Sequence, residues 1–393
     1  MLFSFAYFCG TNISSLIIQW EFAMKGVFGK NELLKLVANR RLCPNASYNE
    51  SHMSPASVDL TITGEVYEVE RLLQPEQQSK ERIRTLINAM GCKPVSVGSV
   101  LEVGHTYLGK ASMDVNFPPG VYGYLNAKSS SGRNFLFVRS LADGIHMFDS
   151  ADRRHDGYSG EVWLVIMPLA FPVILTREER YNQLRVFNAD TRFSQGDLDA
   201  LLLKQDLLFR RGGEPYKQGE LSLFTHDGSV LSTLYAKPGE IIGYVAKRGV
   251  KPLDLTLRNL DPKEYFEPVY AEVVQSTGSD KIVSFVRIEG GRYYLLSTNE
   301  MIKIPTTHSA ELVALDTRLG FFFSHFAGFF DPGFFGTATL EVFAPHDVML
   351  RHKQPVARFV FEELISETVS YKEQGNYHGQ VATQLPKQFR PWS

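Results

Sequence analysis

The chain has 393 residues, with 41 lysines and arginines against 43 aspartates and glutamates, and a net charge of -2. No overall positive field therefore draws it to nucleic acid or to an anionic membrane, and a small free substrate fits better. Cys9, Cys43 and Cys92 have no Cys-x-x-Cys spacing, so neither a disulfide framework nor a cysteine zinc site is indicated. The composition points to an intracellular protein, which we expect in the cytoplasm.

The first 23 residues are apolar, but they carry several polar side chains and lack the basic start of a secretory signal. We expect no membrane span there. A more ordinary run begins at Met24, so residues 1–23 are predicted to be a disordered extension or to follow from a misassigned start. A weak targeting segment and an interface strand are the alternatives.

Helical periodicity occurs in few places along the chain. Apolar residues recur three or four positions apart in residues 31–39, 76–90 and 196–204, which predicts helices there. Elsewhere, short runs such as GVYGYLNA, GEVWLVIM and TATLEVFA alternate with turns rich in Gly, Pro, Asn and Asp. The pattern predicts a mainly β protein built from barrels or jelly rolls, with a few short helices.

An internal repeat indicates two related halves. The same five features follow one another in each half. They are an Asp-Leu strand (SVDLTI, PLDLTL), a strand ending in proline (VNFPP, IKIP), an arginine-containing turn (SSSGR, ALDTR), an aromatic-glycine turn (DGYSGEV, DPGFFGT) and a closing strand (NQLRVF, VARFVF). Two unrelated β domains with similar turns are the alternative. We predict domains at residues 24–192 and 216–368, a helical connector at 193–215 and a C-terminal lid at 369–393.

The hexapeptide KSSSGR, residues 128–133, combines hydroxyls, small residues and two cations directly after a predicted strand. A phosphate chain requires hydrogen-bond donors, close backbone approach and positive charge, so this segment is a candidate phosphate site. A solvated, serine-rich hairpin turn would have the same composition.

Glu341 and Arg318 are the residues of the second half that could carry chemistry. The alternation of TATLEVF places Glu341 on one strand face with Thr337 and Thr339, where partial burial would suit a general acid or base. A solvent-facing glutamate is the alternative, and Arg318 fits either a ligand clamp or a structural ion pair. The apolar run FFFSHFAGFF, residues 321–330, is expected to be a buried strand or an oligomer contact. None of the ten histidines belongs to a zinc-deaminase signature.

Three motifs together resemble the metal-independent dCTP deaminases of the trimeric dUTPase-like superfamily, in their double-length, two-domain bacterial form. They are SSSGR, DPGFFG followed five residues later by Glu341, and YKEQGNYHGQ near the C-terminus. The resemblance covers nearly the whole chain from Met24. It implies that a Ser-Ser-x-x-Arg turn holds the triphosphate and a water molecule, that the Asp-Pro-Gly turn shapes the pyrimidine and sugar pocket, and that the glutamate moves protons.

Transferred position by position, the motif residues divide between the two halves. In the second half Arg318, Ala327, Asp331 and Glu341 match, but Ala314 and Leu315 replace the serines. In the first half Ser129, Ser130 and Arg133 match, next to the candidate phosphate ligand Lys128, but Val165 and His155 replace the glutamate and the aspartate. In the tail, Tyr371 and Gln380 match, and Asn376 replaces a lysine. We therefore expect the first half to lend its phosphate site to a pocket whose base is Glu341.

The resemblance predicts hydrolytic deamination of dCTP to dUTP and ammonia, with Glu341 as general base and acid. The backbone carbonyl of Ala327 would orient the water, and Mg²⁺ would be bound through the nucleotide triphosphate, without zinc. A homo-oligomer is expected. A dUTP pyrophosphatase, alone or combined with deamination, is one alternative, although its catalytic aspartate would fall at His155, next to Asp156. A nucleotide-binding regulatory module without catalysis is the other.

Overall fold

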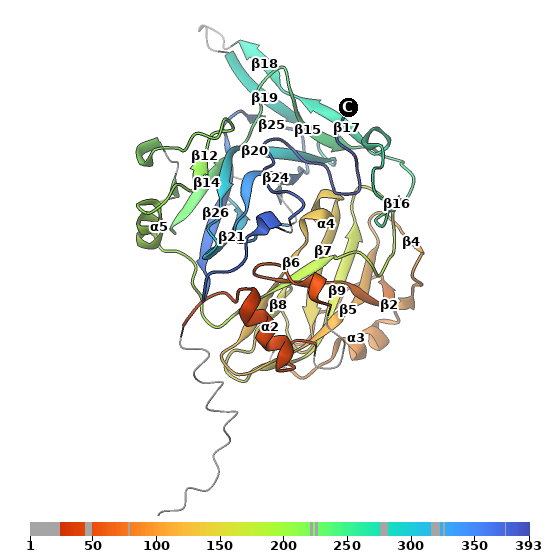
Figure 1. The fold of residues 1–393 in the computed structure, drawn as a ribbon. Coiled ribbons are helices and arrows are strands. Elements are labelled where there is room, and N and C mark those ends of the chain that lie inside the picture. Colours follow the sequence, from red (N-terminus) through yellow and green to blue (C-terminus); the bar gives the residue numbers. More distant parts are fainter. Residues whose placement is uncertain are drawn as a thin grey trace, which may run out of the picture.

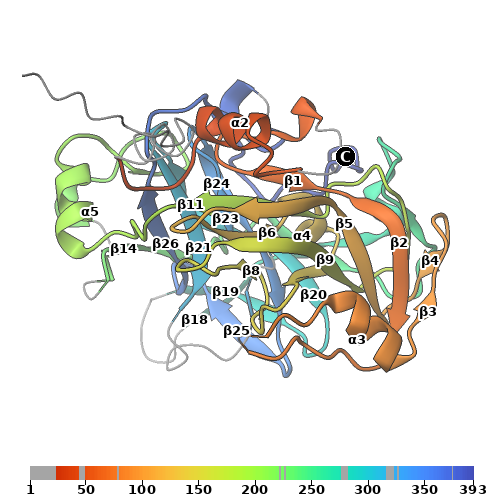
Figure 2. The same ribbon diagram turned by 90° about the horizontal axis from the view of Figure 1, so that it is seen from below.

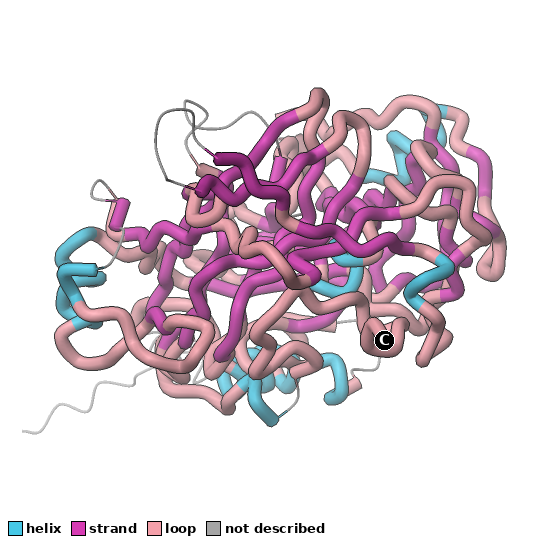
Figure 3. The backbone as a smooth tube through the Cα atoms, turned by 90° about the horizontal axis from the view of Figure 1, so that it is seen from above, coloured by secondary structure: helices cyan, strands magenta, loops and turns pink. Residues whose placement is uncertain are grey.

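The computed structural model describes residues 24–43, 49–77, 79–220, 223–224, 227–275, 282–315, 323–324, 327–373 and 375–393. Strands are far more frequent than helices in this backbone (Figure 3). The expectation for residues 1–23 and the assignment of Arg318 lie outside the described residues, as does part of the apolar run at 321–330. The mainly β fold that the sequence predicts is confirmed.

Two facing sheets form the first half. One has the strand order β1-β11-β6-β8, and the other β3-β2-β5-β9-β7. Their bounds are β1 Val58–Leu60, β2 Ile62–Val69, β3 Lys93–Pro94, β5 Thr106–Phe117, β6 Tyr122–Ala127, β7 Leu136–Ala142, β8 Ser150–Ala151, β9 Tyr158–Pro168 and β11 Asn182–Phe187. Alternating apolar residues of β5 and β9 pack inward, as the period of a strand requires.

The second half repeats this plan with the strand orders β13-β14-β26-β21-β23 and β17-β15-β20-β24-β22. Its strands are β12 Leu208–Phe209, β13 Leu223–Phe224, β14 Ser229–Thr233, β15 Ile241–Ala246, β17 Phe266–Tyr270, β20 Tyr293–Lys303, β21 His308–Ala314, β22 Phe323–Ser324, β23 Phe329–Phe330, β24 Phe335–Phe343 and β26 Pro355–Glu363. A further sheet contains β18 Glu272–Gln275, β19 Ile282–Ile288 and β25 Val348–Arg351.

The strand orders establish the internal repeat and rule out unrelated halves. In sheet order, the strands β1-β11-β6-β8 correspond to β14-β26-β21-β23, and the strands β2-β5-β9-β7 correspond to β15-β20-β24-β22. One predicted match is wrong. The segment PLDLTL forms β16 (Leu253–Asp254), which pairs in parallel with β10 (Val173–Ile174) of the other half, next to β4 (Val100–Leu101). The counterpart of β1 is instead β14, because each pairs antiparallel with the closing strand.

The helices are short, and α2, α3 and α5 lie at the outside of the molecule, whereas α4 lies near its middle (Figure 2). They are α2 (Lys30–Ala38), α3 (Ile83–Met90), α4 (Ser129–Arg133) and α5 (Gln195–Leu202), with 3₁₀ turns η1 (Glu50–His52), η2 (Gln218–Glu220), η3 (Pro262–Glu264) and η4 (Tyr371–Glu373). The helix predicted at 76–90 begins only at Ile83, whose N–H donates to Asp143. The preceding residues bind a first-half loop instead, since Arg153 donates to the Ser79 carbonyl.

The two halves lie side by side (Figure 1), and the core of the first half extends to residues of the second half, which also has a core of its own. Phe135 and Phe171 of the first half pack against Phe266 of the second, with ring centroids 6.3 and 5.4 Å away. Val27 lies between the closing strands, where its N–H donates to the Glu363 carbonyl. Arg185 on β11 forms a buried ion pair of 2.7 Å with Glu362 on β26. Each half therefore has a fixed position against the other.

Candidate active site

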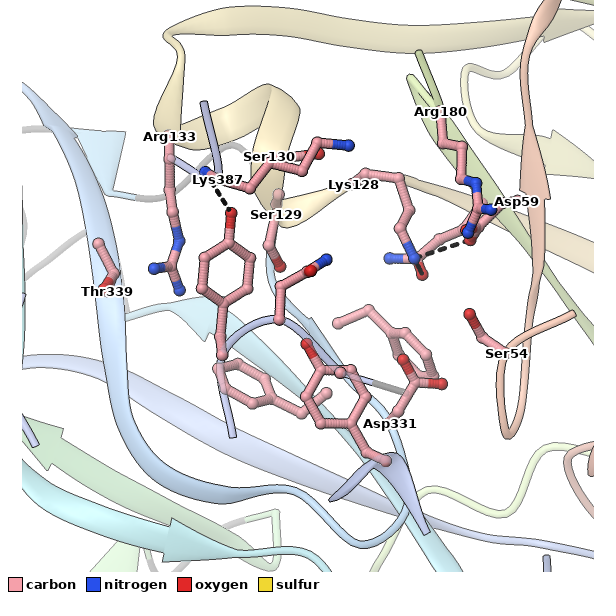
Figure 4. A pocket seen from close by; sticks show the side chains of 18 of the residues that line it. Ser54, Asp59, Lys128, Ser129, Ser130, Arg133, Arg180, Asp331, Thr339 and Lys387 are labelled. Carbon is pink, nitrogen blue, oxygen red and sulfur yellow. Dashed lines mark hydrogen bonds and ion pairs between the residues drawn. The ribbon is translucent and has the colours of Figure 1, made fainter. Parts of the chain in front are cut away.

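A cavity of about 570 Å³ lies between the two halves, and the C-terminal tail forms part of its wall. The first half contributes β1, α4 and the segment before β11, and the second half contributes β23, β24 and the turn between them. Figure 4 shows Arg133 and Thr339 on one side of this cavity, Lys128, Arg180 and Asp59 on the other, and Ser129 between them.

The hexapeptide KSSSGR lines one side of the cavity. It is not the solvated hairpin turn that was the alternative. Residues 129–133 are the helix α4, in which Ser130, Ser131 and Arg133 are buried. The Ser131 hydroxyl donates to the Tyr181 carbonyl, and Ser130 donates to Glu179. These bonds fix α4 against the segment that precedes β11 and leave its other side facing the cavity.

Glu341 lies on β24 opposite α4, and its side chain is only 1% exposed, which excludes the solvent-facing alternative. It lines the cavity together with Thr339, two positions earlier on the same face, while Leu340 and Val342 point into the second-half core. The register Leu295↔Glu341 with β20 holds the strand at this point. A buried carboxylate on a central strand has a fixed position for proton transfer.

The absence of a side chain at Gly132 lets α4 approach Glu341. A Cβ atom at this position would lie 3.0 Å from the Glu341 carboxyl carbon and from one of its oxygens, and 3.0 Å from the Ala327 Cβ. Helix α4 of one half and Glu341 of the other thus lie so close together that even a methyl group between them would be tightly packed.

Replacing Gly132 with alanine should therefore displace the Glu341 carboxylate and reduce turnover, by about tenfold or more if the shift approaches 1 Å. Steady-state kinetics on the purified variant would measure it. Gly196→Ala is the matched control, because a Cβ there would meet only the Ser194 hydroxyl at 3.9 Å. Unchanged kinetics in Gly132→Ala would show that this contact does not position the carboxylate.

The Asp-Pro-Gly turn before β24 carries Asp331 into the cavity. Gly333 has a φ of 79°, and the Phe334 N–H donates to the Asp331 carbonyl at 3.2 Å, which is the geometry of a type II turn. A Cβ at Gly333 would collide with Ser370 of the tail. Burial raises the pKa of the Asp331 carboxyl to about 6, although Lys128 opposes this shift.

Lys128 is the cation that most strongly opposes the raised pKa of Asp331, and it belongs to a partly buried charge cluster. The Lys128 Nζ lies 2.7 Å from Asp59 on β1 and donates a hydrogen bond to Gln183 at 3.1 Å. Asp59 also pairs with Arg180 at 3.2 Å. Burial alone would lower the pKa of Lys128, but the carboxylates of Asp59 and Asp331 raise it above its usual value. The cluster therefore keeps a positive charge on this side of the cavity.

The tail closes the third side and is bound to Arg133. The Arg133 guanidinium lies 3.6 Å from the centre of the Tyr377 ring and donates to the Gln380 side chain at 3.3 Å and the Gln384 carbonyl at 3.1 Å. The Gln380 carbonyl accepts from the Thr337 N–H at 2.9 Å, so the tail also contacts β24. Arg133 thus connects α4 to the tail.

The structure brings nearly all the predicted site residues together. Lys128, Ser129, Ser130, Arg133, Ala327, Asp331, Glu341 and Tyr371 line the cavity. Gln380 does not line it but accepts a hydrogen bond from Arg133, and Arg318 lies outside the described residues. Sequence reasoning missed Asp59, Arg180, Tyr377 and Lys387 as cavity residues. Asp59 and Tyr377 stood within motifs already recognised, whereas Arg180 and Lys387 had no local signal.

In the first half, the position that corresponds to Glu341 lies in an apolar cluster and not at a comparable site. Val165 on β9 is the counterpart of Glu341 and packs with Ile83, Leu86 and Ile87 of α3 in an apolar cluster. A carboxylate buried among these apolar side chains would be costly. Asp156 follows His155, the sequence position at which a pyrophosphatase would have its catalytic aspartate. It lines a different cavity, of about 560 Å³.

Family models match almost all of the described chain. The model "2'-deoxycytidine 5'-triphosphate deaminase (DCD) N-terminal domain" matches residues 24–190, and the model "2'-deoxycytidine 5'-triphosphate deaminase (DCD), C-terminal domain" matches residues 205–389. The chain belongs to the dCTP deaminase family. A comparison with curated proteins finds no significant match.

Among solved structures, a dCTP deaminase from Agrobacterium tumefaciens is similar to this chain. The TM-score is 0.75 at 25% identity, over 88% of this chain and 97% of the other. A structure of oxalate decarboxylase aligns with a TM-score of 0.10 at 10% identity over 85% of each chain, too low to indicate a shared fold. The two-domain architecture of the dCTP deaminase family thus accounts for both halves.

Two further observations concern the described part of this deaminase chain. None of its helices is long and apolar enough to cross a membrane. Within the same residues, no group of three or more His, Cys, Asp or Glu side chains is arranged to hold a metal ion.

Proposed function

We propose that the cavity between the halves binds dCTP with its Mg²⁺ and hydrolyses the C4 amine, giving dUTP and ammonia. The observation that carries the proposal is the contact between α4 and Glu341, which unites the two incomplete motif sets in one cavity. The dCTP deaminase family models over both halves support the reaction class.

The charge of the cavity suits a nucleoside triphosphate. Among the residues that the structure describes, five cations line it: Lys128, Arg133, Arg180, Arg258 and Lys387. Ser129 and Ser130 add hydroxyls beside them. Guanidinium and ammonium groups bind phosphate oxygens through charge-assisted hydrogen bonds, and Mg²⁺ would arrive on the triphosphate as part of the substrate.

The opposite part of the cavity suits the sugar and the base. Asp331 and Tyr371 would contact the deoxyribose, and the aromatic side chains of Phe330 and Phe334 line the same region. An ionised Asp331 accepts hydrogen bonds from sugar hydroxyls, whereas its protonated form also donates.

In the chemical step, water attacks C4 of the cytosine while Glu341 takes one proton from it. The carboxyl group delivers this proton to the ring nitrogen N3. It then takes the second proton from the hydroxyl now bonded to C4 and passes it to the amine as the C4–N bond breaks, so that dCTP and water yield dUTP and ammonia. Ala327 is the candidate for orienting the water through its carbonyl, because it lies beside both Gly132 and the cavity. Arg318 remains a candidate from the sequence alone.

The setting of the reaction is also part of the proposal. We infer a cytoplasmic homo-oligomer that acts on free nucleotides, consistent with the net charge of -2. The deamination would supply dUTP for pyrimidine deoxynucleotide synthesis.

Incubation of the purified chain with Mg²⁺ and dCTP tests the proposal directly. We expect ammonia and dUTP in equal amounts without pyrophosphate. Pyrophosphate in step with dUMP would instead assign a bifunctional deaminase and dUTP pyrophosphatase. Binding of dCTP without ammonia release would contradict the enzyme assignment and favour a nucleotide-binding regulatory module.

A further inference from the structure

Lys387 enters the cavity from the far end of the tail. Its side chain is 19% exposed, and its Nζ lies 2.8 Å from an oxygen of Glu179, a carboxylate that is itself 4% exposed. The Ser130 hydroxyl donates to the same Glu179 oxygen at 3.3 Å. Lys387 therefore lies next to α4, within reach of the hydroxyls and cations of the proposed phosphate site.

The backbone around Lys387 is held in place from several sides. Its N–H donates to the Tyr377 hydroxyl at 3.3 Å. The next residue, Gln388, accepts from Asn134 at 3.1 Å and donates to the Leu255 carbonyl at 3.2 Å. Phe389 then packs against Phe266 with ring centroids 5.2 Å apart. The position of this lysine is thus set by the fold of the tail and not by its ion pair alone.

The ion pair with Glu179 leaves Lys387 able to bind a second anion. An ammonium group has three donors, and Glu179 uses one of them. Lys387 also neutralises the Glu179 carboxylate, whose negative charge would otherwise repel a phosphate chain at this place. By contrast, Asn376 lies exposed at the cavity and carries no charge, at the position where the motif leads us to expect a lysine.

We propose that Lys387 binds the phosphate chain of the nucleotide and takes the place of the lysine that position 376 lacks. The inference rests on the proposed function, since it concerns the same cavity. It makes Lys387 a determinant of specificity for the triphosphate over the monophosphate. Loss of its charge removes one phosphate contact and also exposes the phosphates to the uncompensated Glu179.

Calorimetric titration of the Glu341→Gln protein with dCTP and dCMP tests this assignment, because substrate is not consumed there. Adding Lys387→Met should weaken dCTP binding about tenfold or more, the cost typical of a lost charge-assisted bond, and change dCMP binding little. Adding Asn376→Lys to that variant should restore most of the affinity for dCTP. Lys372→Met is the matched control, since Lys372 lies on the same tail, is exposed and does not line the cavity.

Unchanged dCTP affinity in the folded Lys387→Met variant would overturn the assignment of Lys387 and leave the proposed function standing. An equal loss for dCTP and dCMP would also overturn it, because it would indicate a role in tail structure only. Lys387→Arg should keep the preference for the triphosphate. Absence of any dCTP binding to the Glu341→Gln protein and to the unmodified chain would overturn the proposed function as well.

Discussion

Glu341→Gln should bind dCTP as the unmodified chain does and lose nearly all turnover. Glutamine keeps the size of the side chain and one of its acceptors, so the buried position on β24 remains filled. It cannot accept a proton from water or return one to the leaving amine. A positioned acid or base typically contributes about 10²–10⁴ in rate, and here one group serves several transfers, so we expect a loss near the upper end of that range.

Single-turnover deamination at saturating dCTP, monitored through the release of ammonia, measures the rate. Calorimetric titration with dCTP measures binding. Glu300→Gln is the matched control, because Glu300 is also a buried strand glutamate but binds Thr233 outside the cavity. It should keep its turnover per folded molecule even if its stability falls. Deamination by Glu341→Gln within about tenfold of the unmodified rate would remove Glu341 from proton transfer.

The sequence predicted the strand content and the repeat because period-two alternation and turn residues are local properties. It also identified Glu341 and Asp331, since both belong to a continuous motif whose spacing survives in one half. The sequence indicated less about how deeply these two side chains are buried. A strand glutamate is usually solvated, whereas Glu341 is 1% exposed on a strand between two others, and Gly132 of the other half approaches it closely.

Other site residues could not be predicted because long-range packing alone creates them. Asp59 is separated from Lys128 by 69 positions in the sequence, yet the pair is 2.7 Å apart once β1, β11 and β6 share a sheet. Lys387 follows the tail motif and reaches the cavity only because the tail folds back to Glu179. The mistaken match of PLDLTL to β1 has the same origin, since strand partners decide equivalence and sequence likeness does not.

The division between the halves predicts where a complete site can form. Glu341 and α4 belong to one chain and touch within it, and Val165 of the first half is covered by α3. A complete site therefore requires one intact copy of each half in the same chain. Arg133→Ala should also abolish most deamination, at least about a hundredfold, because the variant loses a buried cation and the tail contacts at Tyr377 and Gln380.

Coexpression of differently tagged Glu341→Gln and Arg133→Ala chains, followed by isolation of any mixed oligomer, tests this arrangement. Each chain then carries one defect, so we expect no more activity than the two variants show separately. If the functional contact instead joined neighbouring chains, random assembly would restore about a quarter of the sites. Thermal unfolding of Arg133→Ala confirms that the chain is folded before mixing. Recovered activity in the mixed oligomer would thus assign the site to a contact between chains, and the contact of Gly132 with Glu341 would not be the catalytic one.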